Sequence, residues 1–195
     1  MNCLLLLGSP RKNGNTETLA GRVAGVVEKN GGHVESVRLC ELDIAPCIDC
    51  GGCRKNGRCV IDDDMQELYS KIDKANTIII ASPIYFYGVT AQTKVFIDRT
   101  QALWSRKYLL KQRIETTGGP ERKGYFLSVA ATSGEKCFDG AILTARYCFD
   151  AMDVEWGGEL VIPGIDHMGA LAKNPSALAK AEGFGEGLLD FDGHN

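Results

Sequence analysis

Five short apolar runs alternate along the chain with segments of helical periodicity, and this alternation limits the possible folds more than any other feature. The clearest run, Thr77–Ala81, is continuously apolar and rich in isoleucine, which is typical of a strand buried on both faces. The expected strands cover residues 2–7, 33–39, 77–81, 123–130 and 156–162, and the expected helices cover 15–29, 62–74, 90–103, 138–152 and 176–189. Strands that alternate with helices predict an α/β fold with a parallel sheet, helices on both faces and ligands at the carboxyl ends of the strands.

The length of 195 residues suits a single domain with a substantial core, and we expect one domain over residues 1–195. The 22 basic and 25 acidic side chains are scattered, and the net charge of −3 argues against nucleic-acid binding as the main role. No apolar run is long enough to cross a membrane, and residues 1–8 lack the basic leader of a signal peptide. Eight cysteines without an export signal indicate a reducing compartment, so we expect a cytoplasmic protein.

Four cysteines fall within thirteen residues in the pattern C-x2-C-x2-C-x5-C, inside an expected loop insertion at about 45–60. They are Cys47, Cys50, Cys53 and Cys59. Gly51 and Gly52 allow the backbone to coil tightly enough for the thiols to converge. Four thiolates on so compact a segment predict a 4Fe-4S cluster. Two alternatives stay open, namely free or oxidised thiols and a zinc site, although structural zinc usually takes two well-separated C-x2-C arms.

The first expected strand is followed by the loop Gly8-Ser-Pro-Arg-Lys-Asn-Gly-Asn-Thr16, which opens a helix with Asn15 or Thr16 as its cap. A helix N-terminus carries partial positive charge and unpaired N–H groups, so a terminal phosphate fits there. Ser9, Asn15 and Thr16 would donate hydrogen bonds to the phosphate, and Arg11 would supply charge. The loop matches neither the P-loop pattern nor G-x-G-x-x-G, which disfavours nucleoside triphosphates and Rossmann dinucleotides. By itself the loop could equally be an ordinary strand-to-helix turn.

Two further loops follow the third and fourth expected strands at the same edge of the sheet. Ser82-Pro-Ile-Tyr-Phe-Tyr-Gly88 carries three aromatic rings, which supply flat walls for a planar ring system. Ala131-Thr-Ser-Gly134 is small and polar, and it suits a close approach of the backbone to a ligand. The aromatic loop could instead be a hydrophobic turn that packs on the next helix. Together, the three loops at one edge predict a mononucleotide site.

The phosphate loop and the aromatic loop, extended through Lys94 to Ile97-Asp-Arg99, resemble the NADPH-dependent FMN reductase branch of the flavodoxin-like superfamily. The segment Pro46–Cys53, with Cys59 and Asp62-Asp-Asp-Met65, makes the chain similar to the iron–sulfur flavoproteins of that branch. These motifs run to about Arg99, and a weaker pattern continues to about Gly164. The resemblance implies a flavodoxin-like three-layer sandwich with five parallel strands in the order 2-1-3-4-5, bound FMN, a 4Fe-4S cluster, and homodimers or homotetramers.

Carried over to this chain, the resemblance implies two sets of site residues. The FMN-binding set is Ser9, Arg11, Asn13, Asn15, Thr16, Pro83, Ile84, Tyr85, Phe86, Gly88, Thr132, Ser133 and Gly134. The cluster ligands are Cys47, Cys50, Cys53 and Cys59. No side chain is expected to act as a catalytic acid or base, because the cofactors carry the chemistry. Elsewhere, His167 is expected on a surface loop or in the flavin pocket, and Asp98 and Arg99 are expected to form an ion pair.

We therefore expect an FMN-dependent oxidoreductase that passes electrons between FMN and the cluster. Its other electron partner would be a ferredoxin, a quinone or a nicotinamide nucleotide. One alternative is a cluster-free NAD(P)H-dependent FMN or quinone reductase. Another is a flavodoxin-type carrier or redox sensor without turnover of its own. No dinucleotide fingerprint in the sequence chooses between NADH and NADPH.

Overall fold

The structure, a computed structural model, describes residues 1–112 and 122–189. Within these ranges five strands form one parallel sheet in the order β2-β1-β3-β4-β5. The strands are β1 (Asn2–Leu7), β2 (His33–Arg38), β3 (Thr77–Ala81), β4 (Lys123–Val129) and β5 (Glu155–Ile162). This is the flavodoxin-like order, so the fold predicted from the sequence is confirmed. The order reverses between β1 and β3, and ligands bind near this reversal in sheets of this type.

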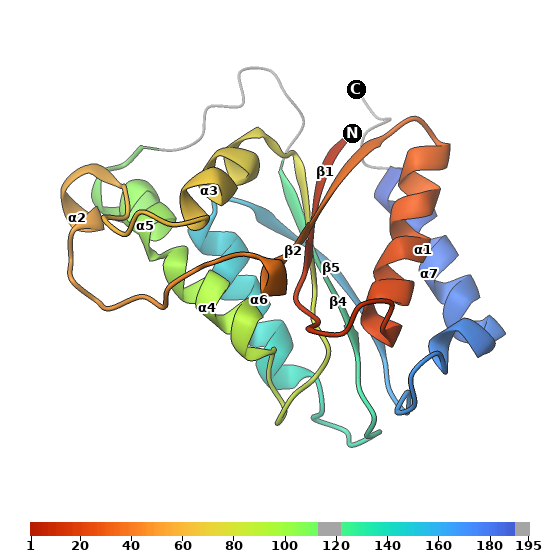
Figure 1. Cartoon of the computed structure of the whole chain (residues 1–195). Coiled ribbons are helices and arrows are strands. Elements are labelled where there is room, and N and C mark those ends of the chain that lie inside the picture. Colours follow the sequence, from red (N-terminus) through yellow and green to blue (C-terminus); the bar gives the residue numbers. More distant parts are fainter. Residues whose placement is uncertain (113–121, 190–195) are drawn as a thin grey trace.

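Helices cover both faces of the sheet. They are α1 (Asn15–Lys29), α2 (Cys53–Asn56), α3 (Met65–Lys74), α4 (Ala91–Arg99), α5 (Gln101–Trp104), α6 (Asp139–Ala151) and α7 (Pro175–Leu189), with short 3-10 helices η1 (Leu39–Glu41) and η3 (Leu171–Lys173) and a π-helical turn η2 (Ser105–Leu109). In Figure 1, α1 and α7 lie on one side of the sheet, and α3, α4 and α6 lie on the other. Among the helices of the described ranges, none is both long and apolar enough to span a membrane.

The central strand β1 explains why both faces of the sheet are covered. Successive side chains of a strand point to opposite faces. Leu5 and Leu7 pack in the core that includes α1 and α7. Leu4 and Leu6 pack in the second core, which includes residues of α3, α4 and α6. Because each face of β1 is buried, its sequence is a continuous apolar run rather than an alternating one.

The helix expected over residues 90–103 is interrupted in the structure. α4 ends at Arg99, and α5 begins at Gln101. At the break, the Thr100 hydroxyl donates a hydrogen bond of 2.7 Å to the carbonyl oxygen of Ile97. A hydroxyl that bonds back to the preceding turn competes with the helical pattern and bends the chain.

The helix expected over residues 62–74 starts later than the sequence predicts. α3 begins at Met65, whose N–H donates a 3.1 Å hydrogen bond to the Asp63 carboxylate. Asp63 lies outside the helix and forms an ion pair with Arg99 at the end of α4. A long-range partner therefore decides the conformation of this acidic segment.

The cysteine-rich segment leaves the sheet after β2 and crosses to the far end of α4. It is not a loop throughout, since α2 forms one helical turn over Cys53–Asn56. Figure 1 shows α2 next to α5, and α2 also contacts η2. The cysteine-rich segment is therefore packed against α5 and η2, away from the carboxyl edge of the sheet.

Candidate functional site

A cavity of about 170 Å³ opens at the carboxyl edge of the sheet, where the loops after β1, β3, β4 and β5 meet. It is lined by Ser9, Arg11, Gly14, Asn15, Thr16, Pro83, Ile84, Tyr85, Val129, Ala131, Ile165, Asp166 and Met168. Seven of the thirteen residues predicted to bind FMN are among them: Ser9, Arg11, Asn15, Thr16, Pro83, Ile84 and Tyr85. The structure thus brings the phosphate loop and the start of the aromatic loop into one cavity.

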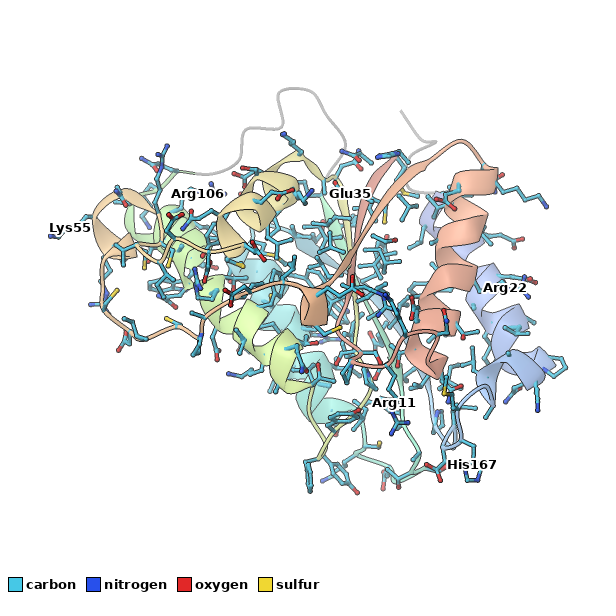
Figure 2. All side chains as sticks on the ribbon, in the orientation of Figure 1. Arg11, Arg22, Glu35, Lys55, Arg106 and His167 are labelled. Carbon is cyan, nitrogen blue, oxygen red and sulfur yellow. The ribbon has the colours of Figure 1, made fainter. Side chains whose placement is uncertain are left out.

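The phosphate-loop end of this cavity is suited to an anion. Helix α1 has Gly14 as its N-cap and no side-chain cap, whereas the sequence favoured Asn15 or Thr16 in that role. The N–H groups of its first turn are therefore left without a capping side chain beside the cavity. Ser9 and Thr16 are buried here, and Arg11 lies at the same edge in Figure 2. An uncapped helix N-terminus with a nearby guanidinium matches the requirements of a phosphate.

The aromatic loop forms a tight hairpin turn at the cavity mouth. Tyr85 and Gly88 exchange N–H···O hydrogen bonds of 2.9 and 3.0 Å. The two residues between them are left-handed, with φ of 48° at Phe86 and 60° at Tyr87. This is the geometry of a type I′ turn, which favours Asn and Gly, so two aromatic residues there are strained. Phe86 is 104% exposed and Tyr87 56% exposed, whereas Tyr85 lines the cavity.

Six predicted FMN-binding residues do not line the cavity in this structure: Asn13, Phe86, Gly88, Thr132, Ser133 and Gly134. In the loop after β4, the Gly134 N–H donates a 3.3 Å hydrogen bond to Thr132 Oγ1, and both residues are exposed. Asn13 donates its backbone N–H to the Glu17 carboxylate at 2.6 Å. The assignment of these six residues to FMN binding stays a prediction.

The loop after β5 supplies a wall of the cavity through residues that the sequence did not predict, since only His167 of this loop was considered for the flavin pocket. Its contributors are Ile165, Asp166 and Met168. This loop is tied to the phosphate loop, because Asn15 Nδ2 donates a 2.8 Å hydrogen bond to the carbonyl of His167. The His167 side chain is exposed and does not line the cavity (Figure 2). The available signal was the position of the loop after a parallel strand, since such loops gather at one edge.

All four cysteines of the motif line a second cavity. Its other walls come from Ile48, Asp49, Gly51, Arg54, Val60, Ile61, Arg99, Gln101 and Ala102. Cys47 and Cys50 are exposed, and Cys53 and Cys59 are partly buried. The Cys53 sulfur lies 3.5 Å from Ser105 Oγ on η2. The motif therefore gathers its thiols around one space that is open to solvent on one side.

Two glycines make this coil possible for different reasons. Gly51 has φ of 70°, in the left-handed region that favours glycine. Gly52 has an ordinary helical conformation, but a Cβ there would lie 2.5 Å from Cγ1 of Val60. Gly51 thus provides the backbone angle, and Gly52 provides the space.

Arg99 lines the inner wall of the cysteine cavity and is held there by a buried ion pair. Its Nη1 lies 2.5 Å from Oδ2 of Asp63, and its Nη2 lies 3.0 Å from Oδ1. Nη1 also donates a 2.7 Å hydrogen bond to the carbonyl of Ala45. The expected pairing of Asp98 with Arg99 is wrong, because Asp98 pairs with Lys94 one helical turn earlier at 2.7 Å.

The ion pair and the nearby thiol shift the pKa values of their neighbours. Burial opposes ionisation of Asp63, but hydrogen bonds from Arg99 and from the backbone N–H groups of Ala45 and Met65, with the charge of Arg99, together outweigh it and hold the pKa of Asp63 below its usual value. Burial likewise opposes the charge of Arg99, but its hydrogen bonds with Asp63, together with the charges of Cys59, Tyr69 and Asp63, raise the pKa of Arg99. The pKa of Tyr69 is raised by burial and by the nearby Cys59 thiol. The inner wall of the cysteine cavity thus carries a permanent, buried cation.

The cysteine cavity suits an iron–sulfur cube better than a single metal ion. Within residues 1–112 and 122–189, no three His, Cys, Asp or Glu side chains are arranged to hold a single metal ion. An iron–sulfur cube makes a different demand, because each of four cysteines binds the cluster at a separate iron. Four thiols that line one cavity match a cube in donor type and in number.

The two cavities are separate and share no lining residue. Helix α4 begins just after the aromatic loop and ends at Arg99, beside the cysteines. Its nine residues span roughly 13 Å at 1.5 Å per residue. Figure 2 shows the same separation, with Arg11 at the lower edge and Lys55 of α2 at the far left.

Comparison with known proteins identifies the family. A family model described as NADPH-dependent FMN reductase matches residues 1–134. An iron–sulfur flavoprotein from Methanosarcina thermophila is 33% identical over 169 residues, which cover 87% of this chain and 81% of the relative. One from Methanocaldococcus jannaschii is 38% identical over 103 residues, which is 53% of this chain and only about half (53%) of the relative.

Among solved structures, the NAD(P)H:quinone oxidoreductase from Methanothermobacter marburgensis superposes with a TM-score of 0.69 over 97% of each chain. At 14% identity this likeness is one of fold alone. The chain therefore belongs to the NADPH-dependent FMN reductase family of oxidoreductases, among the iron–sulfur flavoproteins, as its loop and cysteine motifs predict.

Proposed function

We propose that the protein passes electrons between FMN, held at the carboxyl edge of the sheet, and a 4Fe-4S cluster, held by the four cysteines. One observation carries this proposal: a phosphate loop and an aromatic loop share one cavity, and all four thiols share another. We further infer that residues 1–195 fold as one domain with the cysteine-rich insertion at about 45–60.

The FMN phosphate would bind at the uncapped N-terminus of α1. Ser9, Arg11, Asn15 and Thr16 are its proposed partners, with Asn13 at the edge of the same loop. The flavin ring would lie against Pro83, Ile84 and Tyr85, close to the turn formed by Phe86 and Gly88 and to Thr132, Ser133 and Gly134. Residues at the cavity floor, Val129 and Ile165, are buried and apolar and would exclude water from the ring.

When bound, FMN supplies a centre that takes up two electrons together and releases them one at a time. The protein side chains then have to bind, orient and shield, rather than transfer protons. Arg11 would offset charge on the phosphate, Tyr85 would provide a flat wall, and the loop backbone would offer hydrogen bonds to the ring edge. A side-chain acid or base is not required by this chemistry.

The proposed cluster ligands are Cys47, Cys50, Cys53 and Cys59. Zinc is less favoured, because structural zinc usually takes two well-separated C-x2-C arms, whereas these four cysteines form one compact run. The exposure of Cys47 and Cys50 would leave one side of the cluster open to an electron partner such as a ferredoxin, a quinone or the flavin of another subunit.

The separation of the two cavities favours electron transfer between subunits. The rate of electron transfer falls steeply with distance, and α4 lies between the cavities of one chain. A homodimer or homotetramer in which the cysteine loop of one subunit approaches the flavin of another would shorten the path. Sedimentation of the reduced and oxidised protein tests this inference, and a strict monomer with rapid electron transfer would contradict it.

The central experiment is anaerobic purification followed by analysis of FMN, iron and acid-labile sulfide. We expect about one FMN, about four iron and about four sulfide per chain. Flavin without iron or sulfide would contradict the cluster and leave the FMN site standing. Protein that takes up no FMN even in excess would contradict the proposal as a whole.

A cluster-free NAD(P)H-dependent FMN or quinone reductase is the second candidate. It is favoured by the separation of the two cavities, because the cavity at the sheet edge shares no lining residue with the cysteine cavity. Steady-state oxidation of NADH and of NADPH, with FMN, a quinone or a ferredoxin as acceptor, separates the two candidates. Turnover that is unchanged after complete removal of iron would favour the reductase.

A further inference from the structure

Arg99 is the largest side chain that is fully buried in the described residues, and it lies at the wall of the cysteine cavity. Both terminal nitrogens of its guanidinium are occupied by Asp63, and Nη1 also bonds to Ala45. The carboxylate of Asp63 is itself almost fully buried, with 8% of its side chain exposed. The position of this cation is therefore fixed by Asp63 and Ala45.

The remaining nitrogen of Arg99 has no partner. Its Nε is the one buried side-chain nitrogen or oxygen, within the described residues, that makes no hydrogen bond. A buried donor without an acceptor is unfavourable, and native proteins rarely retain one without a use. Because Arg99 lines the cavity of the four thiols, sulfur atoms in that cavity are the natural acceptors.

A cluster bound by four thiolates carries net negative charge, and the charge increases when one electron is added. Hydrogen bonds to the sulfurs and nearby charge are among the factors that set the reduction potential of such clusters. A cation buried beside the cluster is screened little by water or salt, so its effect is larger than that of exposed residues such as Lys55 on α2.

We propose that Arg99 is a positioning and tuning residue for the cluster: its Nε–H donates a hydrogen bond to a sulfur in the cysteine cavity, and its fixed charge raises the reduction potential. This inference rests on the cluster of the proposed function. One electron enters the cluster on reduction, Arg99 stays protonated, and no bond to it is formed or broken. Asp63 holds the guanidinium in place and partly offsets its charge.

The test uses the full chain purified without oxygen, and it compares Arg99→Gln, Arg99→Lys and Asp63→Asn with wild type. The readouts are the iron content, the FMN content and the midpoint potential of the cluster, followed by the spectrum of its reduced form. We expect Arg99→Gln to disfavour reduction by about tenfold, which is about 59 mV for one electron. Arg99→Lys keeps the charge but lacks the Nε donor, so we expect a smaller shift in the same direction.

Asp63→Asn tests the direction in which charge shifts the midpoint potential of the cluster. It removes the negative charge and leaves the guanidinium, so the midpoint potential should rise instead of fall. A residue with a merely structural role would lower iron content or thermal stability in both variants without opposite shifts in potential. If Arg99→Gln fails to retain iron, the midpoint potentials of Arg99→Lys and Asp63→Asn are compared with that of the wild type instead.

Arg106→Gln is the matched control. Arg106 also forms a two-pronged ion pair, with Asp73 at 2.9 and 2.5 Å, and its stem packs near Gly57 of the cysteine segment. It does not line the cysteine cavity, so its loss should leave the potential unchanged. Iron-loaded Arg99 and Asp63 variants with the potential of wild type would overturn the inference. Wild-type protein without iron and sulfide would instead overturn the cluster itself.

Discussion

The Thr90 hydroxyl donates a 2.6 Å hydrogen bond to the carbonyl of Gly8, joining two residues that are 82 positions apart. Gly8 follows β1 and opens the phosphate loop, and Thr90 is the N-cap of α4. The Gly8 N–H donates to the carbonyl of Ala81 at the end of β3. The start of the phosphate loop and the start of α4 are therefore held together at the point where the strand order reverses.

This junction leaves no room for a side chain at Gly8. A Cβ there would lie 1.9 Å from Thr93 Oγ1 and 3.3 Å from the Ala81 carbonyl oxygen. Gly8→Ala should therefore destabilise the fold by about 1–3 kcal/mol and weaken FMN binding, as measured by urea denaturation and flavin titration. Gly21→Ala on α1 is the control, because its Cβ would meet nothing within 4 Å and should stabilise the helix by about 0.5–1 kcal/mol. Equal stability of the two variants would contradict the packing argument.

Arg11 should contribute to binding through the phosphate alone. It lines the cavity next to the N-terminus of α1, and a charge-assisted hydrogen bond contributes about 1.5–3 kcal/mol. We expect Arg11→Gln to weaken FMN binding by about tenfold or more, and to leave the binding of riboflavin, which lacks the phosphate, unchanged. Arg22→Gln, which removes an exposed ion pair with Glu182, should alter neither affinity. An equal loss of riboflavin affinity would place Arg11 at the ring instead.

Cys50 should be needed for iron and not for flavin. It lines the cysteine cavity and has no part in the cavity at the sheet edge. Cys50→Ser should therefore lose iron and sulfide while FMN content stays at the level of the wild type. Cys40→Ser is the matched control for iron content. The Cys40 thiol lies outside the cysteine cavity, 3.6 Å from the Ser9 carbonyl oxygen, so this variant should keep its iron and sulfide. Iron that survives in Cys50→Ser would show that the ligand set is wrong.

The stability of the α6 side of the molecule should depend on pH through Asp150. Its carboxylate accepts hydrogen bonds from Lys107 Nζ at 2.8 Å and from the Tyr108 hydroxyl at 2.7 Å. Burial opposes its ionisation, but these bonds outweigh it and hold the pKa of Asp150 below its usual value. The unfolded chain therefore binds this proton more readily, and the stabilisation is present above the unfolded pKa of about 3.9 and lost as the pH falls through the folded pKa.

Asp150→Asn should accordingly lower the free energy of unfolding at neutral pH and approach the wild type in acid, by about pH 2 to 3. Chemical denaturation at the two pH values measures the difference. Asp98→Asn, which removes the exposed pair with Lys94, should have little effect at either pH. A penalty for Asp150→Asn that is the same at both pH values would rule out ionisation as its cause.

The layers of the fold could be predicted from the sequence because a strand that is buried on both faces has a continuous apolar sequence. β1 and β3 are covered on each side, so their apolar runs are continuous and their bounds were predicted correctly. The break between α4 and α5 was not predicted. It depends on the conformation of Thr100, a residue that is compatible with a helix on pattern alone.

The candidate site was predicted where special residue types gather, and missed where they do not. The phosphate loop carries hydroxyl, amide and guanidinium groups, which indicate their chemistry directly. Ile165 and Met168 line the same cavity but have no chemical signature, and only the assembled sheet brings them there. The Arg99–Asp63 pair was missed for another reason: the partners are 36 positions apart, and Asp98 stood next to Arg99 as a local alternative.

Helix α4 is anchored at both ends, by Thr90 to the phosphate loop and by Arg99 to the entrance of α3. A helix that is held at both ends in this way fixes the distance between the phosphate loop and Arg99 at the wall of the cysteine cavity. If electrons cross between polypeptides, diluting the protein below the dissociation constant of the oligomer should slow electron transfer from FMN to the cluster while leaving each cofactor bound.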